Sequence, residues 1–346
     1  MAGPAAAADL PRGGPVVARL DAVVLAGGLG RRMDPLTRDL PKPLLPVGLH
    51  PLVEHQVACL SAVGVDRVVL ATSYRADDFI DLTRALRAKG VHLTTVVEET
   101  AQGTGGGLRG ALLALPGTDE VVVLNGDLLT GHDLAAQVAS LRAAPDEVLG
   151  SVHVREVPDA RPYGSVLTEG RRIRAFVEKS PDPPSRIVNA GTYVVRAALL
   201  EELAAGVLSL EHEVFPVLAA RGALHAYREE AYFLDVGTPA ALVRANRDLV
   251  LGDGPSWLLR AGADPHGALV AADADVDASA TVAGGSVVHP RASIGPGASL
   301  DAAVVLPGAA IAAGAVVTRS VIGRDARVGP GARVVDGALG TGGSAD

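Results

Sequence analysis

Cysteine is almost absent from this 346-residue chain, because Cys59 is the only one. A single thiol excludes an intrachain disulfide and argues against a cysteine-based metal site. The chain also lacks any apolar run long enough to cross a bilayer. Its first residues show neither the basic start nor the apolar stretch of a secretory signal. We therefore expect a cytoplasmic protein without a membrane partner.

Positive charge is in the minority, with 31 basic residues against 39 acidic ones and a formal net charge of −8. An acidic chain repels polyanions, so nucleic acid is a poor partner, whereas a small phosphorylated ligand needs only local positive charge. Among these basic residues arginine dominates, and the only lysines are Lys42, Lys89 and Lys179. Two of them, Lys42 and Lys179, lie in the motifs described below, where a compact ammonium differs physically from a guanidinium.

The length of the chain predicts two domains. Short apolar segments alternate with helix-like segments up to about residue 250, which is typical of βαβ units and a mostly parallel sheet. We expect a disordered tail (1–20), an α/β domain (21–252), a linker (253–265), a repeat domain (266–338) and a second disordered tail (339–346). Expected strands lie at 22–26, 67–72, 91–97, 121–125, 148–154, 172–178, 187–195 and 224–235, and expected helices at 53–64, 77–89, from about Leu108, and at 239–249.

A six-residue period dominates the last eighty residues. Its apolar positions form three ladders that slip by one residue at 300–305 and 317–322: Val276, Val282, Val288, Ile294 and Leu300; Val305, Ile311 and Val317; Ile322, Val328 and Val334. Such a period predicts a coil with one inward apolar side chain on each short face, and it resembles the hexapeptide-repeat left-handed β-helix. We expect three to four coils. A disordered Ala/Gly-rich tail is the weaker alternative.

A glycine-rich segment, LAGGLGRRMDPLTRDLPKPLLPV at 25–47, directly follows the first expected strand. Glycines without a Cβ let backbone N–H groups approach phosphates. The dinucleotide pattern fails because it requires glycine where Met33 stands, and the P-loop pattern has no match. We interpret the segment as a phosphate site, and a loop that serves only a tight turn is the weaker alternative. Its glycines and cations are Gly27, Gly28, Gly30, Arg31, Arg32, Arg38 and Lys42.

Two aspartates each follow an expected strand. Asp127 comes after VVVLN, and Asp235 ends an apolar run before Gly-Thr-Pro. Open α/β sheets place their sites at such strand ends, and a carboxylate there can hold Mg²⁺ against phosphate oxygens. For Asp127, a simple Asn-Gly-Asp turn is about equally plausible. For Asp235, a helix-capping role is weak, since Thr238 before Pro239 suits the cap better.

The order of these motifs resembles the sugar-1-phosphate nucleotidyltransferase family. G-G-x-G-x-R, P-L-T and P-K-P match its signature, and E-K (178–179), N-A-G-x-Y (189–193) and Tyr163-Gly164 match its sugar-side motifs. Ser180 departs mildly from the proline that often follows the lysine. Alone, Glu178 and Lys179 could be a solvated strand end whose side chains face opposite ways. The resemblance implies an α/β, Rossmann-like mixed sheet flanked by helices, with 21–252 as the catalytic domain.

The resemblance also implies the site residues. The catalytic residues would be Arg32, Lys42, Asp127 and Lys179, and the Mg²⁺ ligands Asp127 and Asp235. The nucleotide would contact Leu25, Ala26, Gly27, Gly28, Gly30, Gly103 and Thr104, and the sugar phosphate would contact Gly164, Glu178, Lys179, Asn189 and Gly191. The implied reaction joins a nucleoside triphosphate to a sugar 1-phosphate and releases pyrophosphate.

The base and sugar depend on weaker signals. Gly103-Thr104-Gly105-Gly106 is closer to the turn of mannose-1-phosphate guanylyltransferases than to the thymidylyl- or adenylyltransferase version, which favours GTP and mannose 1-phosphate. Heptose or cyclitol phosphates, as in antibiotic biosynthesis, remain open, as does adenylyl or thymidylyl transfer to glucose or valienol-type 1-phosphates. A non-catalytic nucleotide-sugar-binding subunit and a bifunctional enzyme with acyltransferase activity in the repeats are the rivals from other classes. His289 could serve such acyl transfer, but a surface turn beside Pro290 is its simpler interpretation. We also expect a homo-oligomer, because repeat domains often form subunit interfaces.

Overall fold

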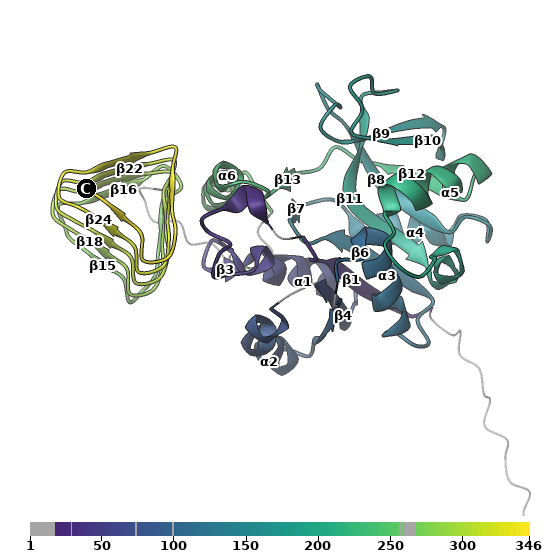
Figure 1. Ribbon diagram of the computed structural model, residues 1–346, viewed down its shortest axis with the longest axis horizontal. Coiled ribbons are helices and arrows are strands. Elements are labelled where there is room, and N and C mark those ends of the chain that lie inside the picture. Colours follow the sequence, from purple (N-terminus) through teal and green to yellow (C-terminus); the bar gives the residue numbers. More distant parts are fainter. Residues whose placement is uncertain (1–17, 29, 73–74, 99, 256–257, 259–266) are drawn as a thin grey trace, which may run out of the picture.

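The computed structural model describes residues 18–28, 30–72, 75–98, 100–255, 258 and 267–346. An α/β domain, whose last helix is α6 (Pro239–Leu251), is followed along the chain by a β-helix (Figure 1). Most of the expected N-terminal tail (1–20) and linker (253–265) lies outside the described residues. Within the described ranges, no helix has both the length and the apolar character needed to cross a bilayer.

A nine-stranded mixed sheet forms the α/β domain, in the order β5-β4-β1-β6-β11-β8-β12-β10-β9. Strands β5, β4, β1 and β6 are parallel, whereas β11 is antiparallel to both of its neighbours β6 and β8. This arrangement confirms the predicted Rossmann-like α/β class. The strands are β1 (Leu20–Leu25), β4 (Arg67–Thr72), β5 (His92–Val97), β6 (Glu120–Asn125), β8 (Gly150–Glu156), β9 (Gly164–Glu169), β10 (Arg172–Glu178), β11 (Ile187–Arg196) and β12 (Leu224–Arg228).

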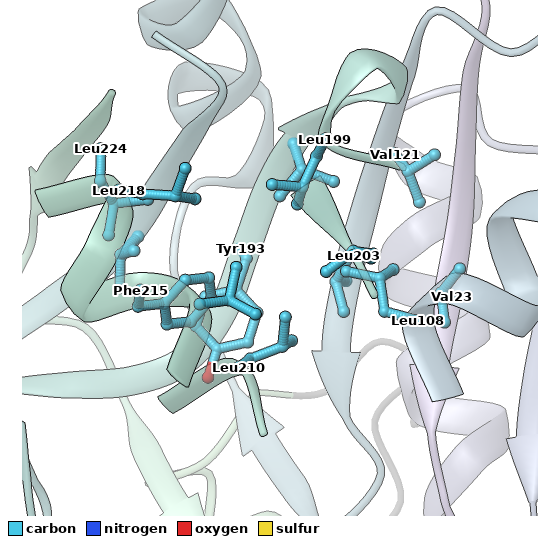
Figure 2. Packing of buried hydrophobic residues seen from close by; sticks show 14 of the residues in the cluster. Val23, Leu108, Val121, Tyr193, Leu199, Leu203, Leu210, Phe215, Leu218 and Leu224 are labelled. Atoms are coloured by element: carbon cyan, nitrogen blue, oxygen red, sulfur yellow. The ribbon is translucent and has the colours of Figure 1, made fainter. Parts of the chain in front are cut away.

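Helices cover both faces of this sheet because its strands are apolar on both sides. Val23 packs into one hydrophobic cluster, whereas its neighbours Ala22 and Val24 pack into the other. Helices α3 (Gly103–Leu113) and α5 (Phe215–Arg221) cover the first face, part of which is shown in Figure 2. Helices α1 (Leu52–Ala62), α2 (Ile80–Ala88) and α4 (Leu134–Arg142) cover the second. Burial of this apolar surface is the main stabilising contribution.

Helix α3 begins five residues earlier than expected, at Gly103 rather than about Leu108. The glycines are therefore the first turn of the helix and not a loop before it. The backbone N–H of Gly105 donates to the carbonyl of Leu208 at 2.8 Å, and a Cβ on Gly103 would lie 2.5 Å from that oxygen. Tertiary contact with residue 208 thus overrides the low helix propensity of glycine.

The expected strand at 224–235 is two strands in different sheets. After β12 the chain leaves the large sheet, and β13 (Phe233–Asp235) pairs antiparallel with β7 (Leu128–Thr130). In this register Asp235 lies opposite Leu128, the residue after Asp127. The small sheet therefore brings together two aspartates that are 108 positions apart in the sequence.

Three parallel sheets of five, five and four short strands form the β-helix. The ladder residues fill its interior, so the β-helix predicted from the six-residue period is confirmed. Successive coils pair Leu269 with Val287, eighteen residues on, but Val287 with Val304, seventeen residues on. The one-residue slips occur where a non-glycine corner residue has positive φ, at Ala302 and Arg319.

The β-helix is longer than predicted. Its strands run from β14 (Leu269–Val270) to β27 (Ser344–Ala345), which makes more than four coils instead of three to four. Residues 339–346, expected to be disordered, thus include β27, which pairs in parallel with β24 (Arg327–Val328). Leu339 and Ala345 pack against the interior cluster. The prediction was wrong because the last coil, rich in glycine and alanine, lacks the valine and isoleucine ladder.

The phosphate segment packs against the β-helix. Met33 and Leu36 share one buried cluster with Val304 and Leu306 of the β-helix and with Leu242 of α6. At the same interface a Cβ on Gly340 would lie 3.0 Å from Cβ of Pro35. Figure 1 shows α6 between the β-helix and the rest of the α/β domain. The β-helix therefore helps to hold the phosphate segment in position.

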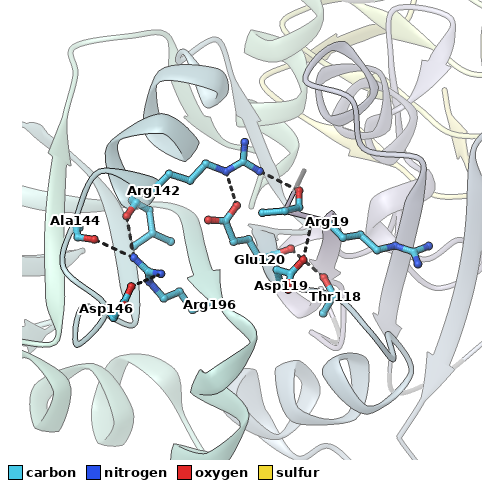
Figure 3. A network of polar contacts seen from close by, with 10 residues as sticks. Arg19, Thr118, Asp119, Glu120, Arg142, Ala144, Asp146 and Arg196 are labelled. Atoms are coloured by element: carbon cyan, nitrogen blue, oxygen red, sulfur yellow. Dashed lines mark hydrogen bonds and ion pairs between the residues drawn. The ribbon is translucent and has the colours of Figure 1, made fainter. Parts of the chain in front are cut away.

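An arginine-rich network secures the opposite end of the central strands (Figure 3). Arg142 of α4 donates to the Glu120 carboxylate at 2.7 Å, and the backbone N–H of Arg19 donates to Asp119 at 2.7 Å. Arg196 donates to the carbonyls of Leu141, Ala144 and Val148. These contacts tie α4 to the amino end of β6, and tie the end of β11 to α4 and the segment that follows it.

Candidate active site

Two adjoining cavities lie beyond the carboxyl ends of β1 and β6, with volumes of about 590 and 460 Å³. The residues that line both are Arg32, Thr104, Asn125 and Asp127. The first is lined also by Leu25, Ala26, Gly27, Gly28, Gly30 and Lys42. The second is lined also by Gly103, Gly164, Glu178, Lys179, Asn189, Gly191 and Asp235. Every residue predicted to bind the nucleotide, the sugar phosphate or the metal therefore lines one cavity or both, and of the predicted phosphate-site cations only Arg38 does not.

The start of the phosphate segment is hydrogen-bonded at the ends of β4 and β6, the strands on either side of β1. The backbone N–H of Ala26 donates to the Ala71 carbonyl at 2.7 Å, and that of Gly126 donates to the Leu25 carbonyl at 2.8 Å. Gly30 has φ +62°, and its carbonyl accepts the Thr37 hydroxyl at 3.0 Å. One predicted cation differs in role, because Arg38 pairs with Asp34 at 2.6 Å and lines neither cavity.

Opposite charges meet where the cavities join. Lys42 Nζ lies 2.6 Å from Asp127 Oδ2 and 4.0 Å from Asp235 Oδ1, and Arg32 Nη2 lies 3.8 Å from Asp235 Oδ2. The Lys42 side chain is 11% exposed, whereas that of Arg32 is 70% exposed. Burial, followed by the repulsion of the Asp127 carboxylate, raises the pKa of Asp235 above its ordinary value. The arrangement concentrates negative charge that is only partly neutralised by Lys42.

The two aspartates suit a magnesium site that is completed by water and substrate, rather than a metal site formed entirely by protein ligands. Oδ1 of Asp235 is buried and has no hydrogen-bond partner, so this oxygen is available to coordinate a metal ion. The described residues contain no group of three or more His, Cys, Asp and Glu that could hold a metal. Mg²⁺ typically takes one or two carboxylates and completes its shell with water and substrate phosphates. Asp127 and Asp235 supply that number.

The absence of a side chain at Gly164 leaves room for the Glu178 carboxylate beside the second cavity. Gly164 pairs with Glu178 across β9 and β10, and a Cβ there would lie 2.5 Å from Glu178 Oε2. Lys179 has φ +45° immediately after β10 and lies with Nζ 3.3 Å from Glu178 Oε1. Strand alternation predicts opposite directions for these two side chains. The left-handed residue ends the strand, so both line the same cavity.

An irregular part of β11 presents Asn189. The pairing of β11 with β8 shifts between Asn189 and Tyr193, and Gly191 has φ +68°. The Asn189 Oδ1 accepts the backbone N–H of Gly191 at 2.9 Å, while its Nδ2 donates to the Tyr193 hydroxyl at 2.8 Å. A Cβ on Gly191 would lie 2.9 Å from Nδ2 of Asn125. Glycine is therefore required twice here, for its backbone conformation and for its lack of a side chain.

Sequence reasoning missed several residues that line the cavities. Asn125, whose buried Oδ1 has no hydrogen-bond partner, lies between them. Gly237 could have been found, because it follows the Asp235 motif, and a Cβ there would lie 2.8 Å from Asp235 Oδ1. Glu211 carries no local signal in LSLEHEVF. Others include Ala101, Gly126, Leu128, Pro162, Ser209, His212 and Phe233.

Comparison with known proteins matches both parts of the chain. The nucleotidyl transferase family model matches residues 21–250, and the GMPPB C-terminal domain model matches residues 266–342. Mannose-1-phosphate guanylyltransferase of Mycobacterium tuberculosis is 40% identical over 78% of this chain and 75% of its own length. The Aspergillus fumigatus mannose-1-phosphate guanyltransferase is 33% identical over 64% of this chain and 61% of its own length.

A solved structure supports the same assignment. HddC from Yersinia pseudotuberculosis, complexed with GMP-PN, is 28% identical and superposes with a TM-score of 0.55. That match covers 65% of this chain and 97% of HddC. The family match covers most of the described α/β domain, and the cavities lie within it. The chain therefore belongs to the nucleotidyl transferase family.

Proposed function

We propose that this protein is a Mg²⁺-dependent guanylyltransferase that converts GTP and mannose 1-phosphate into GDP-mannose and pyrophosphate. One observation carries the reaction type: a glycine-lined cavity and a second polar cavity meet at Asp127, beside Lys42. That geometry suits two phosphorylated substrates whose phosphates must approach each other. The preference for GTP and mannose is supported by the names of the relatives from M. tuberculosis and A. fumigatus.

The proposed chemistry is a single in-line displacement. A phosphate oxygen of the sugar 1-phosphate forms a bond to the α-phosphorus of GTP, and the bond from that phosphorus to the β-phosphate oxygen breaks. Pyrophosphate leaves with the electron pair, and no covalent protein intermediate forms. The protein contributes position and electrostatic stabilisation, as in phosphoryl transfer generally.

Each charged side chain has a distinct role in this proposal. Lys42 stabilises charge on the α-phosphate, and the exposed Arg32 neutralises the departing pyrophosphate. Lys179 holds the phosphate of the sugar. Hydrogen bonds from the sugar hydroxyls to Glu178 and Asn189 fix the ring in the second cavity. The backbone N–H groups of the glycine segment bind the remaining phosphate oxygens.

Asp127 and Asp235 would hold the magnesium ion. When bound, the ion supplies positive charge that screens the phosphates from each other and from the carboxylates. Before substrates arrive, Lys42 partly fulfils this screening, because its ammonium contacts Asp127 and approaches Asp235. The carboxylates in turn keep the lysine side chain extended toward the junction of the cavities.

A substrate matrix tests the proposal. Purified full-length protein is assayed for pyrophosphate release with each of four nucleoside triphosphates and with mannose, glucose, heptose and cyclitol 1-phosphates. We expect the highest kcat/KM for GTP with mannose 1-phosphate and no turnover without Mg²⁺. A higher value for another base or sugar would overturn the substrate assignment. Absence of release with every pair would favour a non-catalytic nucleotide-sugar-binding subunit.

A further inference from the structure

A hydrogen-bonded network joins the two cavities through one carboxylate that the proposed chemistry does not use. Glu211 Oε2 accepts the Thr104 hydroxyl at 2.6 Å and the Ser209 hydroxyl at 3.2 Å. Its Oε1 accepts the Tyr193 hydroxyl at 3.3 Å. Glu211 lines the second cavity, and Thr104 lines both cavities. A single side chain thus contacts α3, β11 and Ser209, which directly precedes its own helical turn.

The direction of each donor in this network is fixed. Because the Asn189 Oδ1 accepts the N–H of Gly191, its Nδ2 must face Tyr193, which accepts at 2.8 Å. The hydroxyl proton of Tyr193 is therefore free to point at Glu211. The ring is 1% exposed and packs edge-on against Phe215 with 4.9 Å between centroids, so it cannot swing aside (Figure 2).

The backbone around Glu211 is also unusual. Residues Leu210–Val214 form a short π-helix, a conformation that is rare and often found at functional sites. The Ser209 hydroxyl caps it by accepting the N–H of His212 at 3.1 Å. The N–H of Leu210 donates to the Thr104 hydroxyl at 2.9 Å. The π-helix is therefore tied to the first turn of α3 by the same hydroxyl that binds Glu211.

From this geometry we propose that Glu211 is a positioning residue that couples binding of the nucleotide to binding of the sugar phosphate. A nucleotide that fixes Thr104 in the first cavity also fixes the Glu211 carboxylate. The carboxylate holds the Tyr193 hydroxyl, and this hydroxyl orients the Asn189 amide toward the sugar cavity. The inference rests on the proposed function, since it assumes that the two cavities bind these two substrates.

Binding measurements test the coupling without turnover. The Kd of a GTP analogue with a methylene group in place of the oxygen between the α- and β-phosphorus is measured by calorimetry on the full chain with Mg²⁺, with and without saturating mannose 1-phosphate. Coupling is reciprocal, so one direction is sufficient. We expect mannose 1-phosphate to tighten binding of the analogue about tenfold in the natural protein. In Tyr193→Phe, which keeps the ring but removes the hydroxyl, the effect should fall below about twofold.

Two further variants separate positioning from loss of structure. Thr104→Val should also lose the coupling, whereas Thr104→Ser, which keeps the hydroxyl, should retain it. Tyr232→Phe is the matched control, because it removes another hydroxyl that donates to a carboxylate, that of Asp248 at 2.9 Å, in a residue that lines neither cavity. It should show the natural coupling. In steady state, Tyr193→Phe should raise KM for mannose 1-phosphate more than it lowers kcat.

The outcomes distinguish this inference from the proposed function. Natural coupling in Tyr193→Phe, or no coupling in the natural protein, would overturn the inference even if pyrophosphate release is normal. Failure of the natural protein to release pyrophosphate with any substrate pair would instead overturn the proposed function. Melting temperatures of all variants, measured alongside, show whether each is folded. If Tyr193→Phe unfolds, the Thr104 pair decides alone.

Discussion

The ammonium of Lys42 lies 2.6 Å from the carboxylate of Asp127, although 85 positions separate the two residues. They meet because β1 and β6 are parallel neighbours, with Leu25 opposite Asn125 at their carboxyl ends. Lys42 lies in the segment that leaves β1, and Asp127 comes shortly after β6. In the proposed function, phosphates that enter the first cavity would compete with Asp127 for the lysine, and a cation held by Asp127 would release the lysine to them.

Replacement of Lys42 by alanine should reduce kcat about 10²–10³-fold while the protein stays folded, because a nearby positive charge that stabilises the reacting phosphate is lost. Lys42→Arg should not restore the rate, since a planar guanidinium does not fit a side-chain position that is only 11% exposed. Lys89→Ala, which removes a lysine paired with Glu54 at 2.7 Å, is the control. Near-normal pyrophosphate release in Lys42→Ala would contradict the role.

Replacement of Asp235 by asparagine should weaken the requirement for magnesium rather than abolish the fold. The half-saturating Mg²⁺ concentration should rise about tenfold or more, because one of two charged ligands is lost. Titration of pyrophosphate release with MgCl₂ measures this shift. Asp336→Asn, which breaks an exposed ion pair with Arg319 in the β-helix, is a matched control that should leave the titration unchanged. An unchanged titration in Asp235→Asn would refute the ligand assignment.

Gly340 tests whether the β-helix supports the phosphate segment. Gly340→Ala adds a Cβ 3.0 Å from Cβ of Pro35, so the segment must shift by a few tenths of an ångström, and Gly340→Val should enlarge the effect. We expect KM for GTP to rise about threefold and tenfold respectively. Gly337→Ala, whose nearest neighbour is 3.4 Å away, should behave like the natural protein. Equal kinetics for all three variants would show that the contact does not affect the site.

Part of the site could be anticipated from strand ends. Asp127 directly follows a short apolar strand, and such positions meet at one sheet edge, although a simple turn is equally plausible there. The role of Lys42 comes instead from the resemblance of its P-K-P motif to the family. The repeat ladder was predicted more directly, since a six-residue period has few structural solutions. In the repeat region a local pattern was therefore sufficient to place the residues.

The parts that the sequence did not predict depend on tertiary contacts. Glu211 reaches the site from a π-helix whose geometry depends on Thr104 and Ser209, and no local pattern predicts such a helix. The first turn of α3 is helical because residue 208 packs on its glycines. The last coil of the β-helix forms on the coil beneath it, so its small residues need no strong strand preference of their own.

A stacked pair of buried histidines predicts how stability depends on pH. The rings of His132 and His153 lie 4.2 Å apart at 16°, beside α4 and away from the cavities. His132 contacts the Gln137 side chain at 2.8 Å, and His153 contacts the Glu229 carbonyl at 3.1 Å. Burial lowers the pKa of both, and repulsion between the rings helps to lower that of His153 to about 3. Both are therefore neutral in the folded protein near pH 7.

Because the folded pKa is depressed, acid favours the unfolded chain. An unfolded histidine binds a proton below about pH 6.5, while folded His153 does so only near pH 3, so stability falls as pH drops between these values. From pH 7.5 to 5.0 the loss from His153 should be about 2 kcal/mol, and His132 adds to it in the same direction. His153→Gln, which keeps a donor for the Glu229 carbonyl but cannot titrate in this range, should lose less stability over that interval than the natural protein. Urea unfolding at both pH values measures the difference, and equal losses in the two proteins would exclude His153 as the source.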